Sequence, residues 1–231
     1  MNDFYVVAGC RPWNRKVYER NLKGHLPGEW AYASSREELD TLMLRSAPPR
    51  YIFFLHWSWK VPREIWTRTE CICFHMAPLP FGRVGSPLQN LILLGQDRTM
   101  LSALRMEDNV DAGPIYLQED LCLHGTAEEV YIRASTLACR MIGSIVSASP
   151  VPHPQEGEVF VFTRRKPSDS MIPDLRGLDA FHDFIRMLDA EGYPHAFLEY
   201  KGFRIELRRA ARYDGRIVAD AVITDVGDEH T

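Results

Sequence analysis

The sequence has no surplus of positive charge and no long hydrophobic run. It holds 27 lysines and arginines against 31 aspartates and glutamates among 231 residues, a formal net charge of −4. Proteins that neutralise a phosphate backbone usually carry an excess of basic residues, so general nucleic-acid binding is not expected. No apolar stretch approaches the roughly 20 residues that span a bilayer, and no signal peptide is visible, so no membrane partner is expected.

The cysteines offer neither a disulfide framework nor a zinc site. There are five, an odd number with no Cys-x-x-Cys pair and no metal-type spacing. This usage is typical of a reduced, cytoplasmic protein, and we predict no bound metal.

Nucleotide-binding glycine loops are also missing. A dinucleotide site needs Gly-x-Gly-x-x-Gly after the first strand, but the segment 9–13 has a single glycine, and no Walker-type lysine loop exists. NAD and ATP are therefore not predicted as cofactors.

Short apolar runs alternate with helical patterns over the first 148 residues. This alternation favours parallel β-α-β units, in which functional side chains gather at the carboxyl ends of strands. We predict an α/β fold: a Rossmann-like, mostly parallel sheet with flanking helices, and a small α+β appendage at the C-terminus. The expected strands are 4–8, 30–33, 51–55, 70–75, 99–106 and 115–123. The expected helices are 14–22, one opened by Ser35-x-x-Glu38, 62–66, 87–94, and one opened by Thr126-x-x-Glu129.

A proline-rich segment then divides the chain. Three prolines within residues 149–157 indicate a linker or an extended crossing. The predicted domains are therefore 1–148 and 158–231. The second holds a strand at 158–163, a helix at 178–188 and three short strands, and it is small enough to be an appendage.

Cys73 and His75 fall on one face of the expected strand 70–75. A thiol beside an imidazole can act as nucleophile and base, but cysteine is also commonly a small buried hydrophobe. His75 ends the strand, a common position for a general base. Asp111 lies in an acidic turn that backbone preference alone would explain, and it gains interest only if it faces His75.

Two further groups are candidates for ligand contact. Trp57 and Trp59 follow a strand and are suited to line a pocket. Arg164 and Arg165 can pair with phosphates or form an ordinary solvated run.

In this order the residues resemble the folate-dependent formyltransferase family. Its catalytic domain, shared with methionyl-tRNA formyltransferases, carries Asn-x-His, then Pro-x-x-Arg-Gly, and later Asp-x-Gly. The matching positions here are His75, Pro80, Arg83, Pro87, Gln89 and the segment 111–113. The tail at 162–197 is most similar to nucleotide-amino-sugar N-formyltransferases, with the pseudaminic-acid-precursor type as one candidate.

The resemblance implies formyl transfer from N10-formyltetrahydrofolate to the primary amine of a nucleotide-linked amino sugar in bacterial surface polysaccharide biosynthesis. The amine attacks directly through a tetrahedral intermediate, leaving tetrahydrofolate. His75 acts as general base or polarises the formyl oxygen, and Asp111 orients it and relays the proton. A homodimer is one candidate assembly.

The resemblance also implies two sets of binding residues. The expected cofactor-binding residues are Trp57, Trp59, Lys60, Val61, Asp108, Asn109 and Val110. The expected substrate-binding residues are Phe81, Gly82, Arg83, Gln89, Arg164 and Arg165.

Two positions depart from the family. Cys73 stands where the family asparagine holds the developing oxyanion, and a thiol is a weak donor. Val84 replaces the glycine after the arginine. Either other donors hold the oxyanion, which we favour, or the protein binds folate or sugar without catalysis.

Three other reactions stay open as alternatives. They are transfer to another small amine, hydrolysis of the formyl donor, and transfer to methionyl-tRNA. The last is disfavoured because the tRNA enzymes carry a further RNA-binding domain that this acidic chain is expected to lack.

Overall fold

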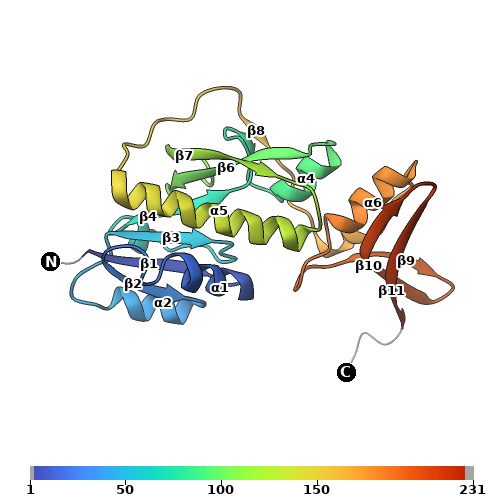
Figure 1. Cartoon of the computed structure of the whole chain (residues 1–231), viewed down its shortest axis with the longest axis horizontal. Coiled ribbons are helices and arrows are strands. Elements are labelled where there is room, and N and C mark those ends of the chain that lie inside the picture. The colour runs from blue at the N-terminus through green and yellow to red at the C-terminus, as the bar shows by residue number, and fades with distance from the viewer. Residues whose placement is uncertain (1–2, 227–231) are drawn as a thin grey trace. The chain divides into compact units, whose positions relative to one another are not determined.

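The central sheet extends to both sides of its first strand. In the computed structural model, which describes residues 3–226, six strands run in the order β2-β1-β3-β4-β6-β7 (Figure 1). β1 pairs in parallel with β2 and β3, β3 pairs in parallel with β4, and β4 pairs antiparallel with β6. The predicted fold class is confirmed. The strands are β1 (Phe4–Gly9), β2 (Glu29–Ala33), β3 (Tyr51–Leu55), β4 (Glu70–His75), β6 (Arg98–Arg105) and β7 (Ile115–Cys122).

Helices follow the strands as the capping signals predict. The Ser35 hydroxyl accepts the Glu38 backbone N–H at 3.2 Å, although the Glu38 carboxylate turns back to the Ser34 N–H instead of that of Ser35. Thr126 and Glu129 form the reciprocal capping box, with bonds of 3.3 and 2.8 Å. The helices are α1 (Pro12–Asn21), α2 (Arg36–Met43), α3 (Arg63–Trp66), α4 (Pro87–Leu93), α5 (Ala127–Ala148) and α6 (Leu178–Arg186).

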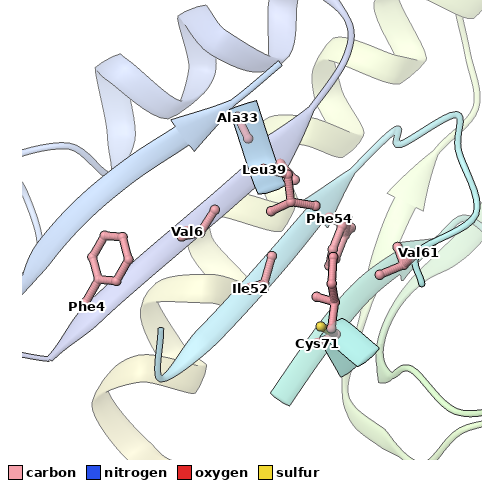
Figure 2. Close-up of a cluster of buried hydrophobic side chains, with 10 residues drawn as sticks. Phe4, Val6, Ala33, Leu39, Ile52, Phe54, Val61 and Cys71 are labelled. Carbon is pink, nitrogen blue, oxygen red and sulfur yellow. The ribbon is translucent and has the colours of Figure 1, made fainter. Parts of the chain in front are cut away.

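One face of the sheet carries a hydrophobic cluster. Val6 of β1, Ile52 and Phe54 of β3, and Cys71 of β4 point to the same side, where they meet Leu39 of α2 (Figure 2). Every residue of β1 and β3 is buried, as expected for parallel strands covered on both faces. This packing fixes the position of the strand ends from which the candidate site is built.

Within the described residues, contacts divide the chain into two compact units. The first holds residues 3–84, 99–121 and 132–161, with most of the central sheet. It also contains a small parallel pair, β5 (Phe81–Arg83) with β8 (Phe160–Val161), where a longer strand at 158–163 was expected. The predicted domain limits at 148 and 158 stay a prediction. The two units are defined by contacts between residues, which does not establish that either one folds independently.

The second unit holds residues 85–98, 122–131 and 162–226. It contains α4, α6, a short 3-10 turn, η1 (Pro167–Ser170), and an antiparallel sheet in the order β11-β10-β9. The strands β9 (Ala196–Tyr200), β10 (Phe203–Tyr213) and β11 (Arg216–Asp225) match the three strands predicted for the tail. β10 and β11 are longer than expected, because a bulge between Arg208 and Ala211 keeps them paired. None of the helices in residues 3–226 has the length and apolarity to cross a membrane.

Candidate functional site

His75 and Asp111 meet in the first unit. β4 ends at His75, and the loop between β6 and β7 brings Asp111 to it, with 3.4 Å between His75 Nδ1 and Asp111 Oδ2. Their side chains are 11% and 14% exposed, so both are largely shielded from bulk water and still reachable by a ligand. Asp111 therefore faces His75, which is the contact that gives Asp111 functional interest.

Both ring nitrogens of His75 face an oxygen atom. Nε2 lies 2.7 Å from the carbonyl oxygen of Gly82. Because a carbonyl oxygen only accepts hydrogen bonds, Nε2 carries a proton in this arrangement. In the neutral ring Nδ1 then has no hydrogen, and it is the nitrogen that faces Asp111. A hydrogen on Nδ1 would point to the carboxylate of Asp111.

The Asp111 carboxylate has a second partner on the backbone. The Val84 N–H donates to Asp111 Oδ2 at 2.9 Å. Both residues have left-handed backbone angles, with φ of 64° at Val84 and 55° at Asp111. Aspartate tolerates this region, but a β-branched residue is strained there. A glycine at position 84 would hold this backbone conformation without strain, whereas Val84 holds it at a cost in stability.

A cavity of about 620 Å³ opens beside this pair. Its wall is formed by the segment from the end of β3 into α3, the end of β4, and residues 104–111. The seven residues expected to bind the cofactor all line it, together with Cys73, His75 and Asp111. Trp57 and Trp59 form an aromatic corner, with ring centroids 4.8 Å apart. Such a volume suits a small organic ligand.

Cys73 is held as a neutral thiol. Burial, together with the negative charge of Asp111, raises the pKa of Cys73 far above its ordinary value. Its sulfur donates to the carbonyl oxygen of Leu104 at 3.8 Å. A thiol without appreciable thiolate is a poor nucleophile, so a neutral, partly buried cysteine fits this geometry better than a nucleophilic role.

His56 is a cavity-lining residue that the sequence analysis overlooked. It follows β3 with a φ of 47°, and burial together with the charge of Arg11 lowers the pKa of His56 to about 4. It is therefore neutral at physiological pH. Its Nδ1 lies 3.4 Å from the amide of Asn14, which also donates to Ser135. The one sequence signal for His56 is its position directly after a parallel strand, where functional side chains gather.

The β5 segment contributes to the site mainly through its backbone. Gly82 supplies the carbonyl that holds His75, and Phe81 stacks on Phe160. Arg83 donates from Nε and Nη2 to the Gln155 side chain, at 3.0 and 2.7 Å. Gln155 belongs to the segment expected to be a linker and was not singled out by the sequence analysis.

The other expected substrate-binding residues lie in the second unit. Gln89 is buried and donates to the Tyr131 hydroxyl and the Met187 carbonyl. This burial argues for a packing role, and the substrate contact of Gln89 stays a prediction. The Arg165 guanidinium donates to the Asp169 carbonyl and lies over the Phe184 ring, whereas Arg164 is exposed. Among residues 3–226 no group of three acidic, histidine or cysteine side chains could hold a metal ion.

Replacing Val84 by glycine should stabilise the protein. A left-handed L-residue costs roughly 1–2 kcal/mol, and the greater chain entropy of glycine offsets part of that gain. We expect the free energy of unfolding, measured by urea denaturation, to rise by up to about 1 kcal/mol. Val110→Gly, at an exposed loop position without positive φ, should give no such gain. A loss of stability in Val84→Gly would refute the strain.

Cys73 should resist alkylation in the folded protein. Its raised pKa leaves almost no thiolate at pH 8, and iodoacetamide reacts with the thiolate. We expect peptide mapping by mass spectrometry to find Cys73 unmodified in buffer at pH 8 and modified in urea at the same pH. Rapid modification of the folded protein would restore the nucleophile hypothesis.

Comparison with known proteins identifies relatives of the whole fold. The structure matches methionyl-tRNA formyltransferase from Clostridium thermocellum at 41% identity and a TM-score of 0.91, covering 96% of this chain and 99% of that one. HypX from Aquifex aeolicus, solved in complex with tetrahydrofolic acid, shares the fold at 15% identity and a TM-score of 0.71, over 89% of this chain and 37% of its own. A sugar N-formyltransferase from Shewanella shares the fold at 14% identity and a TM-score of 0.65, over 91% of this chain and 98% of its own.

Comparison of the sequence alone also finds formyltransferases. Residues 167–224 match a family described as methionyl-tRNA formyltransferase, C-terminal domain. The curated relatives are methionyl-tRNA formyltransferases, and the chain spans about half their length, for example 47% of one that is 32% identical over 146 residues. With a solved relative 41% identical over nearly its whole length, the chain belongs to the formyltransferase family.

Proposed function

We propose that the protein transfers a formyl group from N10-formyltetrahydrofolate to a primary amine, and that this amine belongs to a nucleotide-linked amino sugar. The observation that carries the proposal is the His75–Asp111 pair on the wall of the 620 Å³ cavity. The proposal extends to the roles of these residues and to the two expected sets of binding residues.

The cavity fits the formyl donor of the family, which is N10-formyltetrahydrofolate. A pterin is flat and aromatic, and the corner of Trp57 and Trp59 offers a surface for it. Lys60 and Arg63 also line the cavity and can pair with the carboxylates of the glutamyl tail. The complex of HypX with tetrahydrofolic acid gives support from a protein of the same fold.

When bound, the donor supplies a formyl carbon for the amine to attack, and negative charge develops on the formyl oxygen. In the proposed step His75 and Asp111 handle the proton: the pair takes the proton that the attacking amine loses and returns one to the departing nitrogen. Nε2 is bonded to Gly82, so the ring must exchange this bond before it can contact a substrate. Its N–H is then a donor for the oxyanion, replacing the amide that the family places at position 73.

The acceptor is inferred to be small because the arginines of β10 are already paired with carboxylates. Arg204 and Arg208 both pair with Glu206, at 3.3 and 2.9 Å. Arg209 pairs with Asp220, and Arg212 with Asp179. RNA binding relies on basic groups that release counterions from phosphates, and these paired arginines offer little of that.

Transfer to methionyl-tRNA is the second candidate. It is favoured by the 41% identity to a methionyl-tRNA formyltransferase and by the family match over residues 167–224. The two candidates share one chemistry and differ only in the acceptor.

Removing the imidazole should stop transfer without stopping donor binding. We expect His75→Ala and Asp111→Asn each to lower turnover by about 10²–10⁴-fold, as loss of a general base does. A non-transferable folate analogue should still quench the fluorescence of Trp57 and Trp59 in both variants. Asp40→Asn, exposed on α2, should behave as wild type. Near wild-type turnover in His75→Ala would remove it from the mechanism, and absence of quenching in wild type would remove the donor site.

A parallel assay identifies the acceptor. The protein is incubated with N10-formyltetrahydrofolate and either a nucleotide-linked amino sugar, initiator methionyl-tRNA, or no acceptor, and mass spectrometry then detects formylated product. We expect formylation of the sugar amine, abolished in His75→Asn. Formylation of the tRNA alone would establish the second candidate, donor consumption without acceptor would indicate a hydrolase, and donor binding without turnover would indicate a binding protein.

A further inference from the structure

The proline-rich segment at residues 149–157 is fastened to the candidate site. His153 exchanges two backbone hydrogen bonds with Ile115, at 2.8 and 2.9 Å, where β7 begins. Residue 115 directly follows the loop that carries Asp111. This pairing places Gln155, two residues further along, beside that loop, and all these residues belong to the first unit.

The Gln155 side chain makes four hydrogen bonds. Its amide nitrogen donates to the backbone carbonyls of Asp111 and Gly113, at 2.9 and 2.8 Å. Its oxygen accepts from Nε and Nη2 of Arg83, at 3.0 and 2.7 Å. A primary amide has two N–H donors and one oxygen with two lone pairs, so its hydrogen-bonding capacity is fully used.

These bonds join the loop that carries Asp111 to β5. Asp111 holds a left-handed backbone conformation, which surrounding contacts must maintain. Its carboxylate bonds to the N–H of Val84, the residue directly after Arg83. The amide nitrogen of Gln155 therefore holds the backbone of Asp111. Its oxygen holds Arg83, the residue next to Val84, whose N–H bonds to Asp111.

We propose that Gln155 is a positioning residue for the His75–Asp111 pair. It acts through Asp111 and touches none of the reacting atoms, and its catalytic consequence rests on the proposed formyl transfer. The base of the loop is already closely packed, since a Cβ at Gly113 would lie 1.9 Å from the Arg105 carbonyl oxygen. At Asp111 itself, the hydrogen bond from Gln155 to the backbone carbonyl restrains the loop.

The chemistry of the amide makes two informative variants. Gln155→Met keeps the length and much of the volume of the side chain and removes all four bonds. Gln155→Glu keeps an acceptor for Arg83, but its carboxylate cannot donate to the two carbonyls and repels them. Glu156→Met is the matched control, because it makes a similar change at the next residue, which is exposed.

The Val84 amide proton reports on the position of Asp111 independently of activity. We would measure its chemical shift and hydrogen exchange by NMR in the full chain, together with the melting temperature. In Gln155→Met and Gln155→Glu, the Val84 proton should shift upfield and exchange at least about 10-fold faster than in wild type, as expected for a local opening. Melting temperature and the exchange of β1 amides should stay near wild type. Asp111→Asn gives the reference for a weakened bond, and Glu156→Met should change nothing.

Turnover supplies the second measurement. Displacing a catalytic group by a small distance can lower kcat on the order of 10²-fold, so we expect such a loss in both variants with KM for the donor little changed. An unchanged Val84 amide in both variants would overturn the proposal. So would equal changes in Val84 and the β1 amides with a lowered melting temperature, which would show a merely structural role. A Val84 response in a protein whose wild type transfers no formyl group would support the positioning and refute the proposed function instead.

Discussion

The organisation of the site depends on one carboxylate oxygen, Oδ2 of Asp111. It accepts the N–H of Val84 and faces Nδ1 of His75, so one atom joins the β4 end, the loop between β6 and β7, and the segment after β5. Each link constrains the others, because the carboxylate reaches both partners only while Asp111 and Val84 keep left-handed backbones. The left-handed backbones at both positions, strained at the β-branched Val84, are therefore part of the site's geometry, as is common where function requires a fixed arrangement.

The sheet provides the rigid frame for this arrangement. Parallel pairing of β1, β3 and β4 places their carboxyl ends together, and the fully buried β1 and β3 leave these ends little freedom to move. The cavity opens where the chain leaves β3 and β4, so its wall combines the tryptophans after β3 with His75 at the end of β4. A site supported in this way can keep a hydrogen-bond network in place without a disulfide, and the cysteines of residues 3–226 are free.

Local patterns made much of this predictable, and long-range contacts account for what was not. Strand periodicity and capping boxes are properties of neighbouring residues, so β1 to β4 and α5 were predicted closely. His75 and Asp111 could be singled out because a motif carries them, and Trp57 and Trp59 because they are large aromatic residues directly beyond a strand. Gln155 could not, since its four bonds reach residues 42 to 72 positions away and leave no periodic signal. Gln89 shows the converse: its place in a motif suggested substrate contact, whereas burial between Tyr131 and Met187 gives it packing partners.

Cys73 makes the hydrogen-bond donors of this site different from the arrangement that the family resemblance implies. An asparagine there would present a strong N–H to the developing charge, but the thiol is neutral, weakly donating and directed to the Leu104 carbonyl. Several side chains that line the cavity still carry N–H groups, and that of His75 is one of them once it leaves Gly82. In the proposed mechanism the same ring accepts a proton and donates to the oxyanion, so its position depends on the contact with Asp111. The network through Asp111, Val84 and Gln155 is therefore more important in this chain than it would be with an amide at position 73.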